Sequence, residues 1–151
     1  NQKMKNKNKI LIASDHAGFI LKKKLIDFFK KEKKILYDIG TSSENSVDYP
    51  DYAHKLCEQI SKGNYNSGIL ICGSGIGMSI VANRYQKIRA ALCLNEKMVK
   101  LCRRHNDANV LVLGSRLISY DEATKCIICF IKTSFEAGRH TNRLNKINKC
   151  L

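Results

Sequence analysis

Short apolar runs alternate along this chain with longer amphipathic segments, and this alternation limits the folds that it can adopt. The runs with the length and residue types of buried strands are residues 10–14, 35–39, 67–72, 89–94 and 109–113. The segments with helical spacing or helix-boundary residues are 19–31, 51–61, 78–85, 96–104, 120–135 and 139–149. Strands that alternate with helices predict a five-stranded parallel sheet with helices on both faces. Right-handed crossovers then favour a three-layer, Rossmann-like α/β domain.

The 151 residues fit a single domain. We predict a disordered basic tail at residues 1–9 and one domain over residues 10–151, which ends in a basic helix. No stretch approaches the roughly 18 to 20 apolar residues that a membrane span needs. The polar first residues lack the apolar middle of a signal peptide. We therefore expect a cytoplasmic protein without membrane contact.

A net charge of +14 would suit a protein that binds nucleic acid. The lysines are dispersed, however, and the few aromatic residues do not interleave with them, which weakens the case for base stacking. Attraction of small anionic substrates is the better interpretation, and we expect no nucleic-acid partner.

Seven cysteines, an odd number, indicate reduced thiols rather than a disulfide framework. Cys126 and Cys129 match the CxxC spacing, but they lie within an apolar run that reads as helix. No second CxxC or paired histidine accompanies them, so we interpret them as small buried residues. We predict no metal site and no cofactor.

Ligands of open parallel sheets bind beyond the carboxyl ends of the strands. Asp15 and His16 follow the first apolar run, and Arg116 follows the fifth. The third run is followed by the strongest local signal in the chain, which consists of Gly73, Ser74, Gly75, Ile76 and Gly77. Three glycines in five residues let backbone N–H groups converge on an anion. The spacing fits neither a dinucleotide-binding fingerprint nor a P-loop.

Cys72 stands directly before this turn, where neighbouring N–H groups favour a reactive thiolate. A small buried apolar residue is the alternative. His105 lies in a polar turn and either transfers protons or caps a helix. Arg139 and Arg143 are four residues apart, so they share a helix face that suits a phosphate group. A solvated basic face is the alternative for this pair.

Several ordered motifs together resemble one family, ribose-5-phosphate isomerase type B, which is related to the galactose-6-phosphate isomerase subunits. The resemblance runs from about residue 9 to residue 148. Its motifs are residues 14–18, 48–50, 68–77, 82–83, 88–90, 104–107, 114–116 and 138–140.

The resemblance implies an aldose–ketose isomerase that interconverts D-ribose 5-phosphate and D-ribulose 5-phosphate without a metal. Cys72 matches the enzymic base, His105 matches the residue that helps to open the furanose ring, and Ser74 assists proton movement. The positions that match substrate-binding residues are Asp15, His16, Tyr49, Gly73, Ser74, Gly75, Ile76, Gly77, Asn106, Arg116, Arg139 and Arg143. Members of the family are homodimers or tetramers with active sites shared between subunits.

Two alternatives remain at this point. One is an isomerase of a hexose 6-phosphate, such as allose or galactose 6-phosphate. Those relatives tend to work as unlike subunit pairs or to depart at the catalytic cysteine, so Cys72 together with His105 favours the pentose enzyme. A non-catalytic phosphosugar-binding protein would have no need for a base, so the combination of Cys72 and His105 favours an enzyme.

Overall fold

The computed structural model describes residues 8–149, and it contains one five-stranded sheet with the strand order β2-β1-β3-β5-β4. All the strand pairs are parallel. The strands are β1 (Ile10–Ser14), β2 (Leu36–Asp38), β3 (Ser67–Cys72), β4 (Ala90–Leu92) and β5 (Val110–Gly114).

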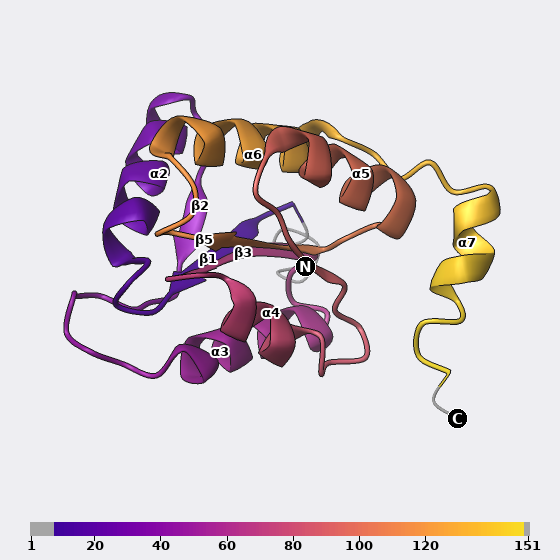
Figure 1. The fold of residues 1–151 in the computed structure, drawn as a ribbon, viewed down its shortest axis with the longest axis horizontal. Coiled ribbons are helices and arrows are strands. Elements are labelled where there is room, and N and C mark those ends of the chain that lie inside the picture. Colours follow the sequence, from indigo (N-terminus) through magenta and orange to yellow (C-terminus); the bar gives the residue numbers. More distant parts are fainter. Residues whose placement is uncertain (1–7, 150–151) are drawn as a thin grey trace.

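Helices cover both faces of this sheet, which confirms the predicted three-layer α/β fold (Figure 1). One face carries α2 (Phe19–Lys31), α5 (Glu96–Asn106) and α6 (Tyr120–Lys132). The other face carries α3 (Tyr49–Ser61) and α4 (Ile76–Ala82). The last helix, α7 (Arg139–Leu144), stands beside α5 and away from the sheet. Among the described residues, no helix combines the length and apolar character needed to cross a membrane.

Local sequence signals set several helix starts. Pro50 lies in the first turn of α3, where its missing N–H costs no helical hydrogen bond. The side chain of Asn95 accepts a hydrogen bond from the Met98 N–H at 2.9 Å and caps α5. Ser119 caps α6 in the same way, through the N–H of Glu122 at 3.1 Å.

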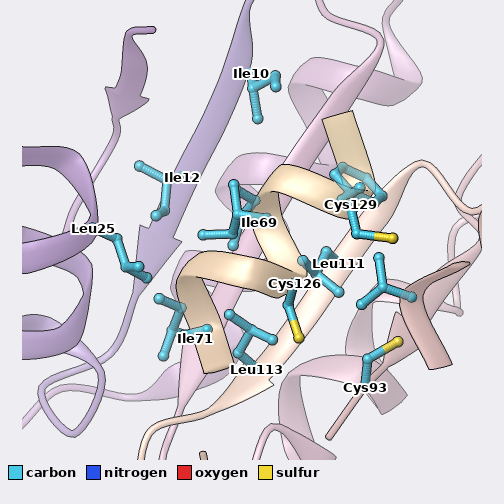
Figure 2. Packing of buried hydrophobic residues seen from close by; sticks show 14 of the residues in the cluster. Ile10, Ile12, Leu25, Ile69, Ile71, Cys93, Leu111, Leu113, Cys126 and Cys129 are labelled. Atoms are coloured by element: carbon cyan, nitrogen blue, oxygen red, sulfur yellow. The ribbon is translucent and has the colours of Figure 1, made fainter. Parts of the chain in front are cut away.

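The core consists of two apolar clusters, one on each face of the sheet. Figure 2 shows the first, in which Ile12, Ile69 and Leu111 from adjacent strands meet Cys126 from α6. Cys126 is fully buried, and burial raises the pKa of its thiol to about 12. Cys129 is buried as well, so the interpretation of this CxxC pair as buried residues is confirmed.

Some predicted boundaries were wrong. Helix α6 ends at Lys132 rather than at residue 135, because Thr133 takes an extended conformation. Helix α7 starts at Arg139 as predicted but ends at Leu144. Helix α4 begins at Ile76 rather than Met78, because Gly75 serves as its N-cap residue. The tail predicted at residues 1–9 lies mostly outside the described residues.

The strand order fixes the place where a ligand can bind. Strands β1 and β3 are neighbours. The chain leaves β1 for β2 on one side of this pair, and it leaves β3 for β4, beyond β5, on the other side. Their carboxyl ends lie together, with Ser14 opposite Ile71. A crevice opens at such a point in parallel α/β sheets. The residues that follow β1 and β3 are therefore brought side by side.

A buried lysine anchors the loop that borders this crevice. The side chain of Lys22, on α2, is fully buried. Its Nζ donates to the Asp38 carboxylate at 2.5 Å and to the Thr41 carbonyl at 2.6 Å. Burial lowers the pKa of Lys22, and the contact with Asp38 opposes that shift. The loop after Thr41 leads to α3, so Lys22 ties the two helical layers together across the sheet edge.

Replacing Lys22 with alanine should destabilise the fold. The substitution leaves the Thr41 carbonyl without its charged donor and removes the partner of Asp38. We expect the free energy of unfolding to fall by about 2–4 kcal/mol in chemical denaturation. The adjacent exposed lysine gives a matched control, since Lys23→Ala should change it by less than about 0.5 kcal/mol. Equal stability of the two variants would contradict the anchoring role.

Candidate active site

A cavity of about 360 Å³ opens at the carboxyl edge of the sheet, between the ends of β1 and β3. Many of the site residues predicted from the sequence line this cavity. Its lining consists of Asp15, His16, Ala17, Tyr49, Cys72, Gly73, Ser74, Gly77, Arg116 and Leu117. Of these, only Ala17 and Leu117 were not predicted. The topology therefore produces the cluster that strand-end reasoning expected.

Cys72 is the last residue of β3, and its sulfur is held by the glycine turn. The side chain is almost completely buried, yet it lines the cavity. The N–H of Gly75 donates a hydrogen bond to Cys72 Sγ at 3.2 Å. Gly75 has a φ of 77°, which favours glycine, and it lies beneath the cavity rather than in its lining. This hydrogen bond fixes the position of the sulfur at the wall of the cavity.

The glycines also admit two side chains to the wall of the cavity. A Cβ atom at Gly77 would lie 2.5 Å from the ring of Tyr49, so only glycine lets Tyr49 rest on the turn. A Cβ atom at Gly73 would lie 2.9 Å from the Arg116 guanidinium. The Arg116 guanidinium therefore lies against Gly73, the residue after Cys72, and adds a positive charge to the lining of the cavity. Ile76, by contrast, is half exposed outside the lining.

Asp15 and His16, directly after β1, line the same cavity. Asp15 is buried, and its Oδ1 accepts a hydrogen bond from the Gly18 N–H at 3.1 Å. His16 Nδ1 accepts one from the Val47 N–H at 3.1 Å, which fixes the ring against the loop before α3. Both side chains are therefore positioned by the backbone, as substrate-contacting groups need to be.

The remaining predicted residues gather elsewhere. A second cavity of about 320 Å³ lies between the end of α5 and α7. Its lining consists of His105, Asn106, His140, Arg143, Leu144 and Ile147. Arg139 is exposed on the first turn of α7 and does not line it. The predicted pairing of Arg139 and Arg143 therefore places one guanidinium in this cavity and the other near it.

The two cavities lie at opposite edges of the sheet. Cys72 ends β3 and is paired with Gly114, at the carboxyl edge. Helix α5 carries His105 near its end and leads into β5, whose first residue Val110 is paired with Gly68 at the amino edge. The four-residue step from Gly68 to Cys72 spans roughly 13 Å of strand. One chain therefore does not bring Cys72 and His105 into a single cavity.

A larger cavity, of about 740 Å³, also lies at the amino edge. Its two arginines have a structural role, because Arg89 and Arg103 both form salt bridges with the Asp107 carboxylate. Arg103 additionally donates to the Ala108 carbonyl at 2.6 Å. This cavity contains none of the predicted site residues, and its charged groups hold the turn between α5 and β5.

A cluster of titratable side chains borders the second cavity. His105 stacks on His140 with ring centroids 4.4 Å apart. Glu136 Oε2 lies 3.9 Å from His105 Nε2 and 3.5 Å from His140 Nε2. Burial lowers the pKa of His140, and His105 and the arginines of α7 add to that effect. The motif at residues 138–140 contains His140 but indicates no role for it, and no sequence pattern pointed to Glu136.

These three residues could in principle hold a metal ion, since their ligand atoms lie within 4.8 Å of one another. The sequence prediction that the chain offers no metal-ligand cluster missed this grouping. Arg104, however, already binds Glu136 Oε1 at 2.5 Å. The two arginines of α7 add further positive charge, which opposes a cation and suits a phosphate group. The charges favour an anion-binding half-site over a metal centre.

Comparison with known proteins agrees with this geometry. The family model described as Ribose/Galactose Isomerase matches residues 10–147. Ribose-5-phosphate isomerase B of Escherichia coli is 38% identical over 139 residues, which is 92% of this chain and 93% of that protein. The crystal structure of a ribose 5-phosphate isomerase from Thermotoga maritima is 50% identical, with a TM-score of 0.91 over 94% of this chain and 98% of that one.

A third relative was solved with a bound sugar phosphate. It is ribose-5-phosphate isomerase B from Mycoplasma genitalium with bound ribulose-5-phosphate, 39% identical with a TM-score of 0.86. The match covers 92% of this chain and 93% of that chain. Fold, site motifs and these likenesses agree over nearly the whole length, and the chain belongs to the Ribose/Galactose Isomerase family, among the type B ribose-5-phosphate isomerases.

Proposed function

We propose that this protein interconverts D-ribose 5-phosphate and D-ribulose 5-phosphate, as an aldose–ketose isomerase of the pentose phosphate pathway. The observation that carries the proposal is the cysteine sulfur held by the Gly75 N–H in a cavity that also contains Asp15 and Ser74. A relative of the same fold has ribulose-5-phosphate bound. The reaction moves protons between neighbouring carbon and oxygen atoms, so it requires no metal or redox cofactor.

The chemistry needs one base and a place for negative charge. In our proposal the Cys72 thiolate removes the proton from C2 of the open-chain aldose, and the C–H electrons shift so that negative charge forms on O1. The O2 hydroxyl proton then passes to O1, and Cys72 returns its proton to C1, which leaves the ketose with a C1 hydroxyl and a C2 carbonyl. Backbone N–H groups of the glycine turn stabilise the enediolate oxygen. Ser74, whose Oγ accepts from the Ile76 N–H at 3.2 Å, lies where it can pass the hydroxyl proton.

Ring opening and phosphate binding fall to the second cavity. In this proposal His105 exchanges a proton with the furanose oxygen and Asn106 contacts the sugar. Both residues line the second cavity, which supports these roles. Arg139 and Arg143 supply charge for a phosphate dianion, which orients the sugar at a point remote from the reacting carbons. The base and these groups lie at opposite edges of one chain, so we propose that two copies combine them in a homodimer, with the two cavities of each site contributed by different subunits.

Exposed apolar residues support such an assembly. Ile76 and Ile80, one turn apart on α4, are each more than half exposed beside the first cavity. A second exposed stripe, the α5 stripe, leads toward the second cavity. It consists of Leu94, just before α5, and of Met98 and Leu101 on the helix. Contiguous apolar surface of this kind indicates a protein interface. Pairing the α4 stripe of one copy with the α5 stripe of another would bring the two kinds of cavity together.

The thiols fit a reducing compartment. All six cysteines within the described residues are free and buried. Burial raises the pKa of the Cys57 thiol to about 12, so it stays protonated and inert. Free thiols in this number favour the cytoplasm as the location of the proposed enzyme.

Alanine in place of Cys72 should leave the fold intact and remove the base. We expect the turnover of ribose 5-phosphate, measured in the presence of a chelator, to fall by about 100-fold or more. Another buried cysteine that lies outside both cavities serves as the control, and Cys129→Ala should keep turnover within about twofold. Near-normal turnover by the Cys72→Ala variant would show that another group is the base.

The same assay decides the substrate class. Ribose 5-phosphate, allose 6-phosphate and galactose 6-phosphate are offered side by side to the unsubstituted protein. We expect the pentose phosphate to give the highest kcat/KM. Faster turnover of a hexose 6-phosphate would support the alternative, and binding without turnover of any of the three would point to a phosphosugar-binding protein.

A charge within the α5 stripe should break the proposed dimer. Leu101→Glu places a carboxylate in the apolar interface, so we expect monomers in analytical ultracentrifugation and a loss of turnover on the order of tenfold. Ile35 is more exposed than Leu101, but it precedes the edge strand β2, far from both stripes in the strand order. Ile35→Glu should therefore remain dimeric and active. A Leu101→Glu variant that stays dimeric would exclude this interface.

A further inference from the structure

Glu136 lies between His105, His140 and Arg104 beside the second cavity, and both its backbone and its side chain are held by hydrogen bonds or salt bridges. Its backbone N–H donates to the Arg104 carbonyl at 3.0 Å, and its Oε1 binds the Arg104 guanidinium at 2.5 Å. This double contact fixes the carboxylate to the last turn of α5. The second oxygen, Oε2, is left facing the Nε2 atoms of His105 and His140.

The segment between α6 and α7 makes a sharp turn directly after Glu136. The two residues after Glu136 both have positive φ, 59° at Ala137 and 55° at Gly138. A left-handed conformation is costly for alanine, which has a Cβ atom and no side-chain hydrogen bond to offset it. The chain turns sharply there and carries His140 back over Glu136. Strain of this kind persists only where the surroundings enforce it.

His140 provides the other side of the cluster. It is 6% exposed, and its Nε2 has no hydrogen-bond partner among the described residues. Its ring stacks on the His105 ring at an interplanar angle of 14°. Among the described residues, the charged groups that contact His105 or act on His140 are Glu136, Arg139 and Arg143, and Arg104 is bound to Glu136. Glu136 is the only acid among them, so it supplies the negative charge next to the His105 ring.

We propose that Glu136 is a positioning residue for His105, which it orients and whose charged form it stabilises when the ring oxygen of the sugar exchanges a proton with His105. This inference rests on the proposed function. A carboxylate that orients a histidine and stabilises its imidazolium ion is a recurrent arrangement in proton-transferring enzymes. At 3.9 Å from Nε2 the carboxylate acts through charge, or closes to a hydrogen bond when substrate and the second subunit complete the site.

Comparing the rates of the forward and reverse reactions distinguishes a positioning role of Glu136 from a merely structural one. Ribose 5-phosphate is mostly a furanose ring, which must open before C2 can lose its proton. Ribulose 5-phosphate carries its phosphate on O5 and has no ring to open, and open-chain aldose can leave the enzyme and close in solution. Loss of Glu136 should therefore slow the reaction that starts from the aldose more than the one that starts from the ketose.

Glu136→Gln keeps the size of the side chain and removes its charge. We expect kcat from ribose 5-phosphate to fall about tenfold, with KM changed by less than about twofold. From ribulose 5-phosphate kcat should fall by less than about twofold. The pH profile of kcat from ribose 5-phosphate should move toward lower pH, because the imidazolium ion loses a neighbouring negative charge. Glu136→Asp, which keeps the charge, should recover part of the loss.

Glu32→Gln makes the same chemical change at the end of α2, outside both cavities, and should leave both directions unaltered. Unchanged kinetics in Glu136→Gln, or equal losses in both directions without a shift of the pH profile, would overturn the inference. Inactivity of the unsubstituted protein toward both pentose phosphates would instead refute the proposed function, so the two failures are distinguishable. Circular dichroism and sedimentation establish that each variant is folded and assembled as the parent is.

Discussion

All five strands run in the same direction, and this polarity decides where each functional side chain lies. Side chains that follow a strand gather at the carboxyl edge, whereas those at the ends of the returning helices gather at the amino edge. Cys72 ends β3 and His105 lies in the last turn of α5, so the connectivity of one chain keeps them apart. The proposed reaction needs both. A second copy is the simplest way for this fold to unite them.

Each half of the proposed site is built by a different kind of interaction. At the carboxyl edge the backbone dominates: the Gly75 N–H holds the sulfur, and Lys22 fixes the loop that carries Val47 against His16. At the amino edge side-chain charges dominate, with Glu136 paired to Arg104 among several arginines. The first half suits proton abstraction and a developing oxyanion, and the second suits a phosphate group and a proton-exchanging histidine.

The sequence predicted the layers of the fold and the carboxyl-edge cavity well, because both follow from local patterns. A short apolar run ending at Cys72 and a glycine turn after it need no knowledge of distant contacts. The ends of α6 and α7 were harder to predict. Helix α6 stops before Thr133, and the segment that follows contacts a residue far away in the sequence, because Glu136 binds Arg104. For the same reason no local pattern could reveal Glu136, or that His105 and Cys72 belong to different cavities.

Mixing two inactive variants tests the shared site most directly. Cys72→Ala lacks the base and His105→Ala lacks the proton-exchanging histidine, so each homodimer has two defective sites. A mixed dimer has one intact site, and after subunit exchange between equal amounts about one quarter of the parental turnover should return. If native mass spectrometry detects mixed dimers while turnover stays at the level of the separate variants, both groups must act within one chain, and the account is contradicted.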